Sequence, residues 1–361
     1  MKKLLPILLL FSFLLSACGN SPPSSLKQSP SSVEALPPSE STGQENEQQS
    51  IFYTDRSPYN AYSASTDKYI FAGVQGEIYR IDRQTDEIQP FISQETHDIK
   101  ISRSMQCFAT AGNALYFLSP NKDLDRNDPN TLDDFELRIM RANVDDATVE
   151  QVAVLKNALY NLYSFGDYLV ARNYGDARGI PEIPEMEFSE AIRVYKVSDG
   201  SSPLEEVPFE SLEKASIDYL EQYFYLNVDI RQLEERLGGG QSETPFSPIR
   251  ANDAYYFLEF GSDEMKKIPL NEGGVEQITV SEEVGSMLNP PGERVQLVNY
   301  DTDWLYFTNY SVVFRVRKDG SEYQIVGLYN NNLNGYVDVV DGRVIYENQE
   351  SALYIDNTLI A

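Results

Sequence analysis

One short sequence unit recurs six times in this chain of 361 residues, and the recurrence limits the possible folds more than any other feature. Each unit is a polar turn that leads into aromatic and β-branched residues, as in Asn-Asp-Ala-Tyr-Tyr-Phe. The six units lie at residues 67–71, 112–117, 166–170, 252–257, 302–307 and 341–346. Such residues favour β-strands, and polar turns between them are typical of antiparallel hairpins. The recurrence therefore predicts an all-β protein.

A second strand-like segment follows each unit and carries a basic or polar side chain beside apolar ones. These segments lie at residues 79–81, 140–142, 195–197, 266–268, 314–316 and 354–356. Turns with glycine follow three of them, at Asp199-Gly200, Gly273-Gly274 and Asp319-Gly320. Glycine adopts the positive φ angles that tight hairpin turns need. We therefore expect each unit to continue into further antiparallel strands.

The spacing of the units selects among all-β folds. Equivalent positions are separated by 46 residues (Phe71 to Phe117), 53 (Phe117 to Val170), 50 (Phe257 to Phe307) and 39 (Phe307 to Tyr346). Repeats of this length are typical of four-stranded propeller blades. We predict a six-bladed β-propeller of antiparallel blades. A β-sandwich is the alternative, but it needs about seven strands and no such repeat. No βαβ periodicity is present, which disfavours parallel α/β folds.

The first 17 residues have the features of a secretory signal peptide. Lys2 and Lys3 precede an apolar stretch at 4–14, and small residues precede Cys18. The stretch is shorter than the roughly 20 residues of a spanning helix. Leu-Ser-Ala-Cys at 15–18 resembles the lipobox of bacterial lipoproteins, which implies a lipid-modified Cys18 as the mature N-terminus. We expect an extracytoplasmic, membrane-anchored protein; ordinary secretion with a chance cysteine is the alternative.

Residues 18–50 are expected to form a tether between the lipid and the propeller at 51–361. They are rich in Ser, Pro, Gln and Glu, a composition that cannot bury enough apolar surface to offset the entropy of ordering. Because the blades must form a ring, we also expect Ile-Phe-Tyr at 51–53 to complete the last blade or to pair alongside it.

The charge balance disfavours polyanionic partners. Without residues 1–17 the chain keeps 27 basic and 56 acidic side chains, a net charge near −29. Nucleic acids and anionic headgroups bind basic surfaces, so neither is expected as a ligand. Cationic partners fit better, although the charge could simply keep a monomer soluble. With Cys18 acylated, only Cys107 remains, and no intramolecular disulfide is expected.

The turn-strand units and the Tyr-Arg-Ile strand at 79–81 resemble those of TolB-like and YWTD-type six-bladed propellers found in many bacterial lipoproteins. The resemblance covers roughly residues 52–361. It implies the architecture and leaves the activity open. True Tyr-Trp-Thr-Asp repeats are absent, so the ligand rules of animal receptors do not transfer to this chain.

Three insertions interrupt the repeat, and their positions predict a binding face. Residues 121–136 and 174–190 lie between the second and third strands of their blades, whereas 209–246 joins two blades. Both kinds of connection open on the same face of a propeller, and loops on a rigid scaffold commonly bind ligands. The expected contact residues are aromatic: Phe135, Tyr174, Phe188, Tyr219, Tyr223 and Phe246.

The third insertion is expected to be helical. Leu226, Ile230, Leu233 and Leu237 recur at helical spacing, and Gly-Gly-Gly at 238–240 would end that helix. An earlier helical segment is expected from residue 211 to about 225, with a strand at 223–225 as the alternative. Packing of the apolar stripe on the propeller's own rim is favoured over a site for another protein.

The first insertion contains a candidate calcium loop. Its oxygen ligands would occupy positions 1, 3, 5, 7, 9 and 12 of a calcium-loop register. The residues are Asp123, Asp125, Asn127, the Pro129 carbonyl, Thr131 and Asp134. The loop resembles Asp-rich loops of dockerin-like and some TolB-like proteins. It departs from that pattern with Asp128 in place of Gly and Asp134 in place of Glu, and a solvated acidic loop is the alternative.

No catalytic residue is predicted. His97 is the only histidine, and no Gly-x-Ser-x-Gly motif is present. Cys107 and Trp304 are expected to be core residues. We expect a non-enzymatic propeller that binds a protein or glycan. The alternatives are a calcium-dependent lyase, lactonase or glycosidase that uses carboxylates on the axis, and a structural envelope component.

Overall fold

The structure is a computed structural model that describes residues 60, 62–74, 76–101, 107–123, 134–156, 158–175, 191–197, 204–224, 249–258, 263–270, 274–309, 311–328, 333–348 and 352–360. The chain divides into two units, Met1–Glu47 and Gln48–Ala361. The signal peptide, Cys18 and the tether lie outside the described residues. Among the described helices, none is long and apolar enough to cross a membrane.

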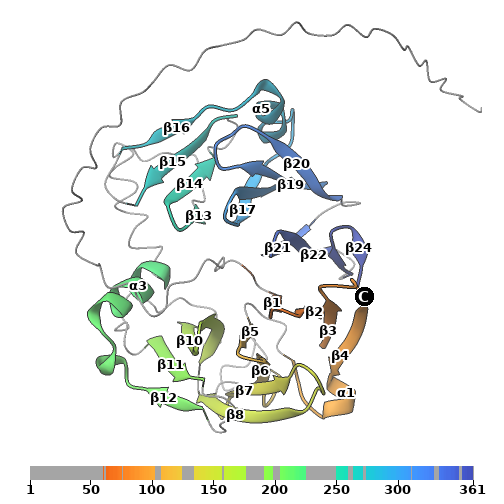
Figure 1. Ribbon diagram of the computed structural model, residues 1–361, viewed down its shortest axis with the longest axis vertical. Coiled ribbons are helices and arrows are strands. Elements are labelled where there is room, and N and C mark those ends of the chain that lie inside the picture. The colour runs from red at the N-terminus through yellow and green to blue at the C-terminus, as the bar shows by residue number, and fades with distance from the viewer. Residues whose placement is uncertain are drawn as a thin grey trace, which may run out of the picture. The chain divides into compact units, whose positions relative to one another are not determined.

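The second unit contains six four-stranded antiparallel sheets, each built from four consecutive strands (Figure 1). Blade 1 contains β1 (Ser63–Ser65), β2 (Tyr69–Val74), β3 (Glu77–Asp82) and β4 (Ile88–Ser93). Blade 2 contains β5 (Phe108–Ala111), β6 (Ala114–Pro120), β7 (Glu136–Asn143) and β8 (Val149–Lys156). Blade 3 contains β9 (Leu159–Phe165), β10 (Tyr168–Gly175), β11 (Ile192–Lys196) and β12 (Glu205–Val207).

The second half of the unit repeats this arrangement. Blade 4 contains β13 (Ile249–Arg250), β14 (Ala254–Leu258), β15 (Met265–Pro269) and β16 (Glu276–Ile278). Blade 5 contains β17 (Gln296–Tyr300), β18 (Trp304–Thr308), β19 (Val312–Arg317) and β20 (Tyr323–Leu328). Blade 6 contains β21 (Leu333–Val340), β22 (Arg343–Asn348), β23 (Leu353–Ile355) and β24 (Thr358–Leu359).

The blades are arranged around an axis lined by their first strands. These strands contact one another in the order β13, β17, β21, β1, β5 and β9, so that the first and last blades of the chain are neighbours. The protein is a six-bladed β-propeller, and the predicted fold class is confirmed.

The recurring sequence units are the second strands of the blades, and the segments that follow them belong to the third strands. The second strand lies between neighbouring blades on both faces, which explains its apolar composition. All five residues of β14 and of β18 are buried. The first and last strands vary in length, from two residues in β13 and β24 to eight in β21 and β8.

Apolar side chains of neighbouring blades pack face to face. Ile70 of blade 1 and Ile345 of blade 6 share one buried cluster, and Tyr306 of blade 5 and Val344 of blade 6 share another. Each of these four side chains is at most 1% exposed. Burial between blades, rather than within a single sheet, forms the core.

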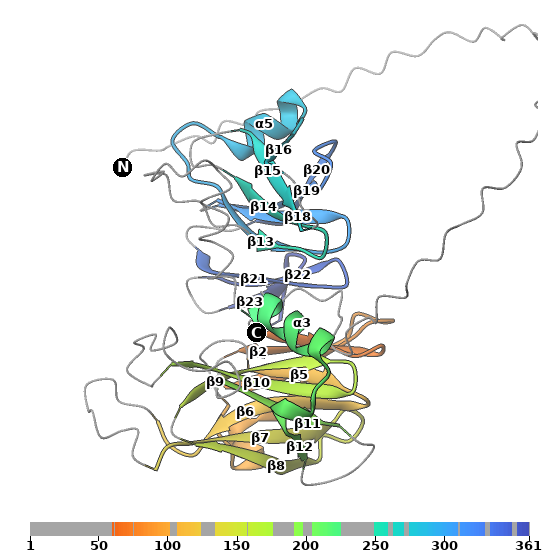
Figure 2. The ribbon, with the colours of Figure 1, turned by 90° about the vertical axis from the view of Figure 1, so that its left-hand side faces the viewer.

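Helix α3 (Lys214–Phe224) lies against blade 3 after a short η3 turn (Phe209–Ser211) (Figure 1 and Figure 2). Tyr223 and Phe224 pack on Phe165 and Tyr163 of β9, with ring centroids 4.9 and 4.7 Å apart. The expected earlier helix is confirmed, and Tyr223 and Phe224 are helical rather than extended. The helix predicted from Leu226 to Leu237 lies outside the described residues. The other helices among the described residues are α1 (Gln94–His97) and α5 (Glu282–Leu288).

The last blade takes all four strands of its sheet from residues 333–359. The expectation that residues 51–53 supply a missing strand is therefore wrong, because β24 follows β23 by a direct hairpin. Pairing of 51–53 alongside the blade lies outside the described residues.

Polar contacts join the first and last blades. The Asn60 side chain donates to the Val339 carbonyl and accepts from its N–H, both at 2.8 Å. The Tyr62 N–H and the Ser63 hydroxyl both donate to Oδ2 of Asp338 at 2.7 Å. Asp338 is only 1% exposed, so this joint is an internal one.

Candidate functional site

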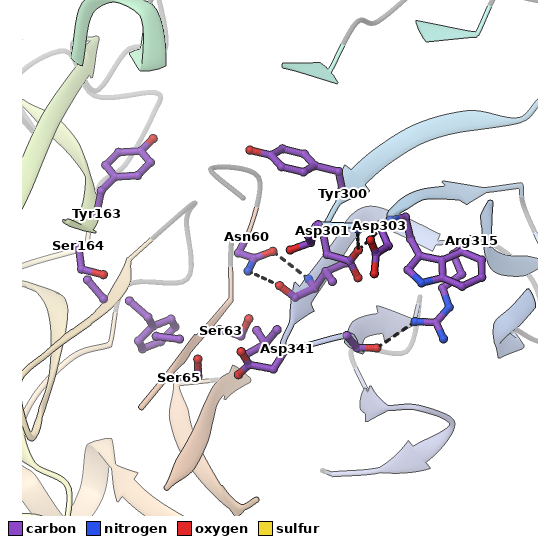
Figure 3. A pocket seen from close by; sticks show the side chains of 18 of the residues that line it. Asn60, Ser63, Ser65, Tyr163, Ser164, Tyr300, Asp301, Asp303, Arg315 and Asp341 are labelled. Atoms are coloured by element: carbon purple, nitrogen blue, oxygen red, sulfur yellow. Dashed lines mark hydrogen bonds between the residues drawn. The ribbon is translucent and has the colours of Figure 1, made fainter. Parts of the chain in front are cut away.

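A cavity of about 430 Å³ lies on the propeller axis (Figure 3). Its wall is formed by the first strands of blades 1, 2, 3, 5 and 6, and by the turns that follow β17 and β21. Asn60, Tyr223 of α3, Trp304 of β18 and Arg315 of β19 complete the lining. The first strands of separate blades meet only at the axis, which is why residues far apart in the sequence share this cavity.

Two tyrosines face each other across the cavity. Tyr163 projects from β9 and Tyr300 from the end of β17, and their hydroxyl groups point toward one another (Figure 3). Both side chains are buried, at 7% and 3% exposure. Burial raises the pKa of Tyr163, so its phenol stays neutral and can donate a hydrogen bond at physiological pH.

Trp304 lines the cavity, but its ring is already engaged by the protein. The guanidinium carbons of Arg315 and Arg317 lie over the ring, 4.4 and 4.6 Å from its centroid. Arg315 also donates from Nε and Nη2 to Oε1 of Gln324. Trp304 is 8% exposed and packs in the cluster between blades 5 and 6, as expected for a core residue.

Three carboxylates line the cavity, and two of them have partners. Oδ1 of Asp301 accepts the N–H groups of Asp303 and Trp304 at 2.9 and 2.8 Å, and Oδ2 accepts the Tyr306 hydroxyl at 2.7 Å. Asp301 therefore holds the turn between β17 and β18. Asp341 pairs with Nη2 of Arg83 at 3.0 Å.

Asp303 is the exception among these carboxylates. Its side chain is exposed and has no hydrogen-bond or ion-pair partner among the described residues. Its backbone carbonyl accepts from the Lys318 N–H at 3.0 Å. Within the described part of the chain, no three His, Cys, Asp or Glu side chains are grouped so as to hold a metal ion.

A second cavity of about 440 Å³ adjoins the first and shares Ser65 and Ser164 with it. The turns between the first and second strands of blades 1 to 3 form its wall. Lys68 in this wall pairs with Asp145 at 3.1 Å, and Asn113 donates to the same carboxylate at 3.0 Å. These bonds, from Asn113 first and then from Lys68, lower the pKa of Asp145.

The candidate calcium loop lies mostly outside the described residues, which include only Asp123 and Asp134 of its ligand set. The Asp123 carboxylate is 90% exposed and pairs with Nζ of Lys100 at 2.9 Å. Asp134 has a positive φ of 59°, and its carbonyl accepts from Nδ2 of Asn121 at 2.8 Å. Asp125, Asn127, Pro129 and Thr131 lie outside the described part, and calcium binding stays a prediction.

The insertions connect the strands as expected, between β6 and β7, between β10 and β11, and between β12 and β13. Their predicted contact residues are placed in different surroundings. Phe135 is 1% exposed in the core between blades, and Tyr219 and Tyr223 pack on blade 3. Of these three, only Tyr223 lines the axial cavity.

The remaining predicted contact residues are less well placed. Tyr174 lies at the end of β10, and its side chain is not among those described. Phe188 and Phe246 are outside the described residues. Binding on the insertion-bearing face therefore stays a prediction.

Apart from Tyr223, the lining of the cavities comes mostly from the first strands and from the turns that follow them, and none of these residues was predicted as a contact residue. Their turn residues, among them Asp301, Asp303 and Asp341, belong to the recurring polar turns, which were interpreted only as hairpin connections. The available signal was the clustering of acidic side chains beside Tyr300 and Trp304 in one such turn.

His97 and Cys107 lie outside the cavities. His97 ends α1, with its Nδ1 3.2 Å from the Ser93 carbonyl. Cys107 is buried, and burial raises the pKa of its thiol, so it remains a neutral, unreactive group.

Comparison with known proteins assigns the chain to no family. No protein-family model and no curated protein match the chain. YCF48 from Cyanidioschyzon merolae is 8% identical, with 82% of this chain and 95% of that chain covered and a TM-score of 0.39.

Two enzymes are similar with lower TM-scores. The periplasmic gluconolactonase of Pseudomonas aeruginosa is 13% identical, with 83% of each chain covered and a TM-score of 0.31. Oligogalacturonate lyase from Vibrio parahaemolyticus is 11% identical, with 80% of this chain and 74% of that chain covered and a TM-score of 0.31. Similarity this low carries no argument about activity, and the fold assignment rests on the six sheets of the structure.

Proposed function

We propose that this chain is a lipoprotein, TolB-like in type and anchored outside the cytoplasm through Cys18, whose propeller binds a protein or glycan without turning it over. The observation that carries the binding function is the axial cavity. It combines two tyrosine side chains with carboxylates that are mostly committed to internal bonds. Cavities of this size and mixed lining are typical of ligand sites.

The state of the carboxylates favours binding over hydrolysis. Glycoside hydrolysis uses two carboxyl groups, one as acid and one as base or nucleophile. In this cavity Asp301 holds a turn and Asp341 is paired with Arg83, which leaves Asp303. A lone exposed carboxylate suits ligand recognition better than two-residue acid-base chemistry.

The anchor is supported by the N-terminal sequence. A signal-like stretch ends at Cys18, and the Ser- and Pro-rich composition of the 32 residues from 19 to 50 predicts a tether with a reach of about 30 Å. Growth with labelled palmitate should give a labelled wild-type protein, and Cys18→Ser should abolish the label and release the protein into the soluble fraction. A labelled Cys18→Ser protein would contradict the anchor.

Binding can be tested with a variant that blocks the cavity. Ser164 is half-buried and lines both cavities, so Ser164→Tyr should fill their junction. The wild-type protein should bind saturably to members of an array of envelope glycans and peptides, and Ser164→Tyr should lose this binding while keeping its melting temperature. Turnover of a lactone, a β-glycoside or a uronate oligosaccharide that Asp303→Asn abolishes would instead establish an enzyme.

A further inference from the structure

We propose that the axial cavity takes an organic cation, the ammonium or guanidinium end of a ligand; this deepens the proposed binding function and rests on it. The inference combines the charge of the lining, one open carboxylate and the two opposed phenols.

The charged side chains around the cavity leave a negative surplus. Asp301, Asp303 and Asp341 face a single lining cation, Arg315. Arg83, Arg317 and Lys318 also lie near the lining, and each pairs with a carboxylate, namely Asp341, Glu322 and Asp253. With these pairs included, five carboxylates still exceed four cationic groups. The net charge of −27 on the whole chain adds to this potential and attracts cations over anions.

The lining cation is held by the protein. Nη2 of Arg315 donates to Oε1 of Gln324 at 2.7 Å, Nη1 donates to the Tyr306 hydroxyl at 3.3 Å, and the guanidinium lies over the Trp304 ring. The N–H groups of Arg315 therefore donate to acceptors within the protein, and one face of its guanidinium group is covered by the Trp304 ring. Few donors remain for an anionic ligand.

The open carboxylate has no competing cation. The nearby Lys318 directs its Nζ to Asp253, at 3.3 Å, and not to Asp303. A ligand ammonium or guanidinium group would supply the partner that Asp303 lacks, with a charge-assisted hydrogen bond.

The aromatic lining distinguishes an organic cation from other ligands. Tyr163 and Tyr300 give the cavity an aromatic lining, and aromatic rings attract cations that carry an alkyl stem. The Nζ of Lys318 already lies 5.4 Å from the Tyr300 ring centroid, which shows that a cation is accommodated beside this ring. A hard divalent ion requires six or more oxygen ligands, and the described residues form no such group.

The test uses three molecules that differ mainly in their end group: n-pentylamine, n-pentanol and pentanoate. Trp304 is the only tryptophan and lines the cavity, so its fluorescence reports occupancy directly. Pentylamine should change the emission saturably, at least tenfold more tightly than pentanoate, and its affinity should fall as salt is added. Equal or tighter binding of pentanoate would overturn the inference.

Paired variants locate the cation. Asp303→Asn should weaken pentylamine binding at least fivefold, whereas Glu205→Gln, which makes the same charge change on exposed β12 away from the cavity, should leave it within twofold. An Asp303→Asn protein that binds pentylamine as the wild type does would refute the assignment. Array binding that Ser164→Tyr abolishes, together with no pentylamine response, would retain the proposed function and reject the cation alone.

Discussion

In blades 1 and 5, the basic residue of the third strand connects its blade to the next one. In blade 1, the Arg80 guanidinium lies 4.6 Å from the Tyr69 ring centroid, and its Nη1 donates to the Val144 carbonyl of blade 2 at 2.7 Å. In blade 5, Arg315 repeats the arrangement over Trp304 and reaches the Gly342 carbonyl of blade 6 at 3.5 Å. A basic residue fits this position because its guanidinium group bonds to the next blade while the rest of the side chain packs on an aromatic ring.

Replacing Arg80 by methionine should destabilise the protein. The change keeps an unbranched stem but removes the bond to Val144 and the contact with Tyr69, and we expect a loss of about 1–3 kcal/mol in unfolding free energy. Urea denaturation measures it. Lys196→Met is the matched control, because Lys196 holds the equivalent position in blade 3 but is exposed. Equal losses in both variants would contradict the connector role.

Two tyrosines link stability to alkaline pH. The hydrogen bond to Glu77, with burial, raises the pKa of Tyr79 to about 12, and burial raises the pKa of Tyr346 to about 12. An unfolded tyrosine titrates near pH ~10. Because both folded pKa values are raised, their stabilisation is complete below pH ~10 and is lost as the pH rises toward 12.

Urea midpoints should therefore be similar at pH 8 and 9 and should fall between pH 10 and 12. Tyr79→Phe removes one of the titrating groups, so its decline over this window should be shallower than that of the wild type. An identical decline in both proteins would show that Tyr79 does not contribute.

Turns place the strands of each blade and also pack against neighbouring blades. Gly320, in the turn between β19 and β20, has a φ of 78°, and a Cβ atom there would lie 2.6 Å from the Thr279 carbonyl of blade 4. Gly112, between β5 and β6, has a φ of 56° and open space around it. The two glycines share a left-handed backbone but differ in their surroundings.

This pair separates backbone strain from blade contact. Gly112→Ala should cost roughly 1–2 kcal/mol for the left-handed conformation alone. Gly320→Ala should cost a further 1–3 kcal/mol or so, because the turn must move away from blade 4. Thermal unfolding of both variants is the measurement. Equal costs would indicate that the turn shifts freely.

The ring of blades is joined between its first and last members by residues far apart in the chain. Asp338 in β21 accepts hydrogen bonds from Tyr62 and Ser63 at the start of blade 1. Nδ2 of Asn299 in blade 5 donates to Oδ1 of Asn60 at 2.9 Å and extends the joint to a third blade. Among the described residues, the first and last blades are therefore joined by the buried carboxylate of Asp338, and each blade takes its four strands from its own part of the chain.

Asp338→Ala should open this joint. The Tyr62 N–H and the Ser63 hydroxyl would lose a buried acceptor, at a cost of about 2–5 kcal/mol. Hydrogen exchange should show faster exchange of β1 amides than of β18 amides. Glu347→Ala, in β22 of the same blade, serves as the control and should change neither quantity. Uniform acceleration in all blades would argue for general destabilisation instead.

The sequence alone determined the class of fold, the number of blades, the identity of their second and third strands, and the type of connection in which each insertion lies. These features are encoded within about 45 residues, because hairpin pairing is local and strands buried between blades must be continuously apolar. The helix from Lys214 to Phe224 could also be predicted, because helical hydrogen bonds join residues that are close in the sequence.

Only the tertiary structure decided which side chains meet. The axial cavity draws its lining from five blades, so neither Tyr163 opposite Tyr300 nor the open Asp303 could be inferred locally. Asn60 and Val339 bond across 279 positions. Contacts of this kind depend on how the blades are arranged around the axis, and the repeat of one blade contains no information about its partner across the ring.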